Sequence, residues 1–135
     1  MQEISPNWIA LIVAVIAKQA LGAAWYSPIA FGPAWSKLTG VSADEMRARL
    51  PKILPIEIVA ALVMAFVLVH AIRYAGANGF ALGAVVGFMN WLGFVAVTQL
   101  NGVLYAKRPL ALVAIDAGYW LVGLVVMGAI LGGWR

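Results

Sequence analysis

The sequence predicts an all-α integral membrane protein, a bundle of four transmembrane helices with a short interfacial helical loop between the first two. Hydrophobic residues make up 64% of the 135 residues and charged residues only 10%, whereas a soluble domain carries about 25% charged residues. A helix crosses the hydrocarbon core in about 20 apolar residues. Runs of at least this length occur at residues 7–26, 53–74, 80–105 and 110–134. They leave room only for short connections, so we expect one domain, residues 1–135.

Aromatic and basic residues around these runs predict their orientation. Each run carries Trp or Tyr near an end, where such rings prefer the headgroup level. Two connections fall on one side and hold six basic residues: Lys37, Arg47, Arg49, Lys52, Lys107 and Arg108. The other side has Arg73 and Arg135. Because cytoplasmic loops are rich in Lys and Arg, we expect both basic loops in the cytoplasm and both termini outside, in the inner (plasma) membrane. The basic loops that flank the spans in the lipid bilayer then account for the net charge of +4. The bilayer is the expected partner, and no nucleic-acid partner is expected.

The first connection, residues 27–52, is predicted to hold two short helices. Proline disfavours helical backbone in the residue before it, so Pro28 ends the first span. A helix can restart at Pro33, which suits a first helical position, and stop at Gly40. Residues 42–45, Ser-Ala-Asp-Glu, match a capping box and predict the second short helix. We expect Pro51 and Pro55 to end that helix and lead into the second span.

The end of the first span and the following loop also carry a recognisable set of residues. The set comprises Gly22, Trp25, Tyr26, Ser27, Pro28, Phe31, Gly32 and Trp35. It resembles the signature of a bacterial membrane family catalogued as domain of unknown function seventeen-sixty-one. The resemblance implies four spans and implies no activity. Taken as residues alone, the segment is a helix exit with aromatic anchors at the membrane interface, and the alternative is a gate or lid over a cavity.

Three polar side chains are expected at one depth inside the spans. Lys18 is the one charge in the first span, and lipid exposure of a mid-span Lys costs at least about 3 kcal/mol, so it needs a protein partner or water. Counted from the cytoplasmic helix ends, Lys18, Gln99 and Asp116 lie about 13, 12 and 10 Å deep. We therefore expect Lys18 to pair with Asp116. The alternatives are a lone, snorkelling Lys18 beside a protonated Asp116, an ion or proton relay, or pairing of Lys18 with Gln99 or Glu57.

Small residues at four-residue spacing predict close packing of the last two spans. The glycines concerned are Gly79, Gly83, Gly87, Gly118, Gly128 and Gly132. Asn90 and Asn101 continue the stripe of Gly83 along a regular helix and extend the expected polar cluster, so a polar pore lining is the alternative to helix contact. Glycine faces exceed what one four-helix packing needs, and this excess favours a homo-oligomer.

The sequence predicts neither an enzyme nor a metalloprotein. Phosphate loops, nucleophile elbows and paired catalytic carboxylates are missing, and the chain has no Cys. His70 has no second His and no carboxylate three or four residues away, so no metal and no cofactor are expected. The favoured function is a non-enzymatic, homo-oligomeric scaffold or partner-binding subunit. The alternative is a channel or carrier for small ions or polar solutes that uses the mid-membrane polar layer.

Overall fold

The computed structural model describes residues 4–135, which are helical apart from short connections and contain no strand. The elements in chain order are α1 (Trp8–Trp25), α2 (Gly32–Thr39), α3 (Ala43–Tyr74), α4 (Phe80–Asn90), the π-helical segment η1 (Trp91–Ala96), α5 (Val97–Ala106) and α6 (Leu110–Gly133). Four stretches are long and apolar enough to cross a membrane: α1, α3, the continuous α4–η1–α5, and α6. The predicted all-α fold class with four spans is confirmed.

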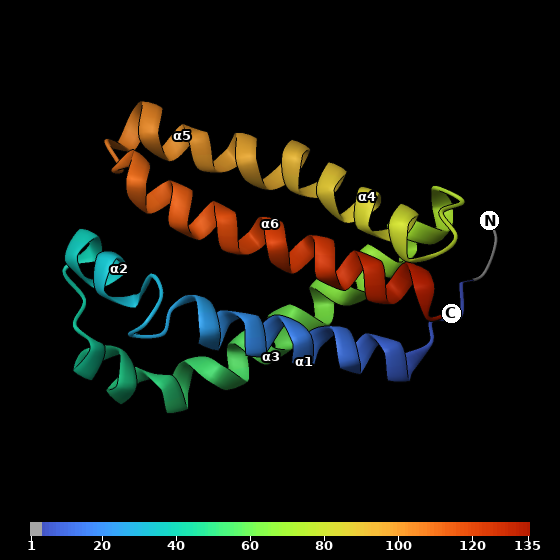
Figure 1. The fold of residues 1–135 in the computed structure, drawn as a ribbon, viewed down its shortest axis with the longest axis horizontal. Helices are drawn as coiled ribbons and strands as arrows, with labels where there is room; N and C mark the ends of the chain where they lie inside the picture. Colours follow the sequence, from blue (N-terminus) through green and yellow to red (C-terminus); the bar gives the residue numbers. More distant parts are fainter. Residues whose placement is uncertain (1–3) are drawn as a thin grey trace.

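Helix α6 is the centre of the bundle. The α4–η1–α5 span lies along one side of it, and α1 and α3 lie along the other (Figure 1). The start of α1, the α3–α4 connection and the C-terminus share one end of the molecule, whereas α2 and the α5–α6 connection share the opposite end. Both basic connections therefore lie at the same end, which we call the loop end.

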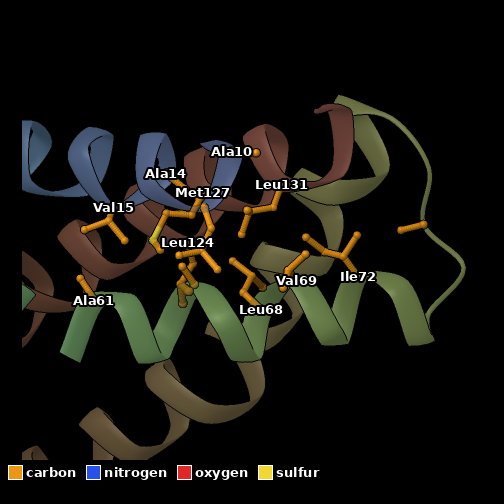
Figure 2. Close-up of a cluster of buried hydrophobic side chains, with 13 residues drawn as sticks. Ala10, Ala14, Val15, Ala61, Leu68, Val69, Ile72, Leu124, Met127 and Leu131 are labelled. Atoms are coloured by element: carbon orange, nitrogen blue, oxygen red, sulfur yellow. The ribbon is translucent and has the colours of Figure 1, made fainter. Parts of the chain in front are cut away.

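The apolar core lies where α1, α3 and α6 meet (Figure 2). On α3 the buried residues recur every three or four positions, which is the period of one helix face. Small side chains such as Ala14 and Ala65 are fully buried there and let the helices approach closely, while Met127 and Leu131 of α6 fill the space between them. This core fixes the crossing of α1 and α3 over α6.

The predicted glycine stripes of the last two spans pack on each other within the chain. A Cβ added at Gly83 would overlap the carbonyl oxygen of Gly128, and the reverse substitution would overlap that of Gly83. The amide of Gly79 also donates a hydrogen bond to the carbonyl of Gly132 at 3.0 Å. Gly87 similarly faces the backbone of α6 at Leu124. Because these stripes are used inside one chain, they no longer point to an oligomer contact.

The first connection differs from expectation in its second half. Helix α2 runs from Gly32 to Thr39 and ends at Gly40 in the left-handed conformation, with φ 77°. The expected second short helix is not separate, because α3 starts at Ala43 and continues through both prolines to Tyr74. A proline removes the hydrogen bond to the carbonyl four residues earlier. In α3 this part of the helix is exposed, so the freed carbonyls need no protein partner and the prolines do not end the helix.

Candidate functional site

Lys18 lies inside the bundle and is paired with Glu57. The helix face that buries the alanines of α1 also carries Lys18 inward, where it is 1% exposed. Its Nζ lies 2.6 Å from Oε1 of Glu57 on α3, whose side chain is 35% exposed. A buried charge is tolerated when it is paired and hydrogen-bonded. The pair thus joins α1 to α3 where the carboxylate is accessible and the ammonium is not.

Two aromatic rings of α6 complete the surroundings of the ammonium. Nζ lies 4.6 Å from the ring centre of Trp120 and 5.4 Å from that of Tyr119. Both distances are within the range of about 6 Å for attraction between a cation and a ring face. The Tyr119 hydroxyl also donates to the Lys18 carbonyl at 3.3 Å. We call Lys18, Glu57, Tyr119 and Trp120 the Lys18 cage.

The predicted pair of Lys18 and Asp116 is wrong. Asp116 instead accepts hydrogen bonds from the Tyr26 hydroxyl at 2.7 Å and from Arg108 at 3.4 Å. Tyr26 therefore lies at the level of Asp116, whereas the Lys18 ammonium lies against the rings of Tyr119 and Trp120. Three to four residues of α6 separate these levels, which is about 5 to 6 Å. The predicted equal depths assumed that all helices end at the same level of the membrane. In the structure the end of α1 lies deeper in the bundle than the start of α6, because Tyr26 lies against Asp116.

Arg108 brings Gln99 and Asp116 together at the loop end. Its Nη1 donates to Oε1 of Gln99 at 3.1 Å, and its Nη2 reaches Oδ2 of Asp116. Sequence reasoning placed Arg108 in a basic loop and missed this bridge. Arg108 follows a tight turn in which Lys107 has φ 55°, a backbone conformation that was not predicted, and its guanidinium reaches both Gln99 and Asp116 from there.

Asn90 and Asn101 do not join the predicted polar cluster. Asn90 is partly buried and donates to the carbonyl of Val86 in its own helix at 2.9 Å, whereas Asn101 is exposed. For Asn101 the cause is η1, because a π-helical segment has more residues per turn than an α-helix and so rotates the helix faces that follow it; Asn90 precedes η1 and bonds within its own helix. Phe94, which lies four residues after Asn90 and within η1, is 74% exposed. A common amide-lined face therefore does not form.

The Trp-Tyr-Ser-Pro segment and the start of α2 fasten α1 to α6. Trp25 donates through Nε1 to the carbonyl of Ile115 at 3.0 Å, and its ring packs near Phe31, with ring centres 4.9 Å apart. Trp35 meets Tyr26 edge-on at 6.1 Å. We call Trp25, Tyr26, Phe31 and Trp35 the aromatic clasp. Protein contacts thus hold rings that we expected to serve as interfacial anchors.

The smaller residues of this segment shape the turn of the clasp. Ser27 donates through its hydroxyl to the carbonyl of Ala24 at 2.7 Å, and Pro28 follows it in the exposed turn. A Cβ at Gly32 would lie 2.5 Å from the carbonyl oxygen of Tyr26, so only glycine fits there. Gly22 and Gly118 likewise face aromatic rings, those of Tyr119 and Trp25 respectively. These residues let the chain fold back onto α6.

Titratable groups connect the loop end to the Lys18 cage. The Tyr26 hydroxyl donates to the Asp116 carboxylate at 2.7 Å. The rings of Tyr26 and Tyr119 meet edge-on with centres 5.4 Å apart. A row of side chains in contact therefore runs from Arg108, which is 41% exposed, through Asp116 and Tyr26 to Tyr119 of the Lys18 cage.

Comparison with curated proteins and with solved structures gave no match. The sequence profile of one family matches residues 9–132, nearly the whole chain, and that family is described as protein of unknown function (DUF1761). The matched region contains all four spans, the aromatic clasp and the Lys18 cage. The chain therefore belongs to the DUF1761 family.

Proposed function

We propose that this chain is a membrane carrier for a small cationic or polar solute and that the Lys18 cage is its solute site. The observation that carries the proposal is the ion pair of Lys18 and Glu57 within the bundle. Taking such a pair out of water costs several kcal/mol per ion, and apolar residues of similar size are often as stable or more so. Ionisable residues within spans commonly mark solute, ion or proton pathways. A functional role therefore accounts for the pair better than stability does.

The exposure of α3 supports access to the cage from the loop end. Between residues 43 and 60, every residue of α3 except Met46 and Glu57 is exposed. Glu57 is thus the first residue of α3 after Met46 that other parts of the chain partly bury. Because 35% of its side chain is exposed, the carboxylate is not sealed by the core of the chain.

The orientation belongs to the same proposal. Lys37 lies on α2, Arg47, Arg49 and Lys52 lie at the start of α3, and Lys107 and Arg108 lie in the α5–α6 connection. Helix α2 and the α5–α6 connection share the loop end (Figure 1). By the positive-inside bias, we place that end in the cytoplasm and both chain termini outside, in the inner membrane. The accessible edge of Glu57 would then open toward the cytoplasm.

A homo-oligomeric or partner-binding scaffold is the second candidate. Only 11% of the most apolar window of Phe80–Ala106 is buried within the chain, and its exposed residues include Phe88, Leu92 and Phe94. A second copy could cover this face, although lipid covers such a face equally well. The glycine argument for an oligomer is lost, because those glycines pack inside the chain. We therefore favour the carrier function over the scaffold function.

A flux assay in proteoliposomes tests the carrier. Methylammonium, sodium, a small zwitterion and a small anion are offered to the parent, to Glu57→Gln and to Glu45→Gln. Glu45 is an exposed carboxylate on the same helix, paired with Arg49 at 3.9 Å, and so is the matched control. We expect flux of at least one solute in the parent and in the control, and none in Glu57→Gln. Without flux in the parent, a stable complex recovered from native membranes by crosslinking would favour the scaffold.

A further inference from the structure

The Lys18 ammonium is held as a bound cation would be. It has one carboxylate oxygen at 2.6 Å and two ring faces at 4.6 and 5.4 Å. A carboxylate with aromatic faces is a common way for proteins to recognise ammonium groups. The cage therefore has the chemistry of a binding site, and a side chain of the same protein fills it.

We propose that Glu57, Tyr119 and Trp120 form a binding site for a small primary ammonium ion, and that Lys18 is the tethered ammonium that fills this site when no solute is bound. The transport step rests on the proposed function, whereas binding at the cage does not. A primary ammonium is the expected class, because it can donate to Glu57 and also place its charge against the rings. A quaternary ammonium has no hydrogen to donate and loses the first of these contacts.

The surroundings of Lys18 allow the exchange. Its four-carbon stem is flexible, and Gly123 leaves space for one methyl-sized group beside it, because a Cβ at Gly123 would lie 4.0 Å from the Cγ atom of Lys18. The accessible edge of Glu57 gives an incoming ion a first contact. One carboxylate balances one positive charge, so the Lys18 ammonium has to leave the cage when the solute binds.

Chemical rescue tests the site without requiring transport. Lys18→Ala removes three methylenes and the ammonium, and n-propylammonium replaces those atoms. We expect Lys18→Ala to melt below the parent in detergent and n-propylammonium to raise its melting temperature by about 5 to 10 °C at about 100 times Kd. The double variant Lys18→Ala/Glu57→Gln should not respond, nor should Lys18→Ala respond to n-propanol. Lys52→Ala, which removes an exposed lysine from α3, is the control for charge alone.

A folded Lys18→Ala protein that n-propylammonium does not stabilise would overturn the proposal. Equal stabilisation of the double variant would overturn it too, because the ion would then bind elsewhere. If Lys18→Ala cannot be purified, the melting temperature of Lys18→Gln is measured with methylammonium instead. Absence of stabilisation, or equal stabilisation of Lys18→Gln/Glu57→Gln, would then overturn the proposal. Rescue without flux in the parent would keep the site and reject the carrier. Flux that persists in Glu57→Gln, together with no rescue, would reject the site and point to a carrier with another solute path.

Discussion

Removal of the Glu57 charge should destabilise the protein strongly, because Lys18 remains buried. In Glu57→Gln the ammonium, 1% exposed, loses the carboxylate at 2.6 Å. Breaking a buried pair from one side typically costs about 3 to 5 kcal/mol. Glu57 is itself 35% exposed, and the rings of Tyr119 and Trp120 still face the ammonium, so we expect the lower end, about 3 kcal/mol.

The double variant Lys18→Met/Glu57→Gln separates a stranded charge from lost packing. Methionine keeps an unbranched apolar stem and leaves no charge to solvate, so the double variant should recover most of the loss, in line with apolar replacement of buried pairs. Unfolding in mixed micelles with increasing denaturing detergent measures the three free energies under one condition. A Glu57→Gln protein as stable as the parent would refute this reasoning. So would a double variant no more stable than the single one.

Three further predictions concern the packing of the helices, the clasp and the orientation. Gly83→Leu should prevent close approach of α4 to α6 and lower the melting temperature markedly, because even a Cβ there overlaps a backbone carbonyl; unchanged melting would show that the two helices do not meet at this residue. Tyr26→Phe should cost about 1 to 2 kcal/mol, since it removes a hydrogen bond to a carboxylate at 2.7 Å. A Tyr26→Phe protein as stable as the parent in the same mixed micelles would contradict a stabilising role for this hydrogen bond. A single Cys at Ser36 should be protected from an impermeant thiol reagent in intact cells and one at Asn78 labelled, and the opposite pattern would reverse the orientation.

The spans and the glycine packing could be predicted from sequence because each depends on a local rule. Bilayer thickness sets the length of a span, and a spacing of four residues places glycines on one face. The continuity of α3 and the π-helical segment could not be predicted in this way. Both depend on tertiary surroundings. The first half of α3 is exposed, so Pro51 and Pro55 can stay within the helix. In η1, Trp91 is placed so that its Nε1 donates to the carbonyl of Ala117 at 2.8 Å.

The need of Lys18 for a partner was predictable, whereas the identity of the partner was not. A second span that begins at residue 53, as the hydropathy predicts, would put Glu57 only four residues, about 6 Å, from the start of the span. Helix α3 begins at Ala43, so Glu57 lies 14 residues along it, which is about 21 Å from its start. That length brings the carboxylate to the level of Lys18. The heights of helix ends are set by the folding of the connections, which hydropathy does not encode.

The central claim is that the Lys18 cage is an exchangeable cation site, and the distance between the Lys18 Nζ and the Glu57 carboxyl carbon tests it most directly. Solid-state NMR on ¹⁵N,¹³C-labelled protein in lipid bilayers can measure this distance, with Glu57→Gln used to assign the signal. We expect about 3.5 Å for the hydrogen-bonded pair without solute, and loss of this contact as methylammonium approaches saturation. A contact that is absent in the solute-free protein, or one that persists unchanged at saturating methylammonium, would contradict it.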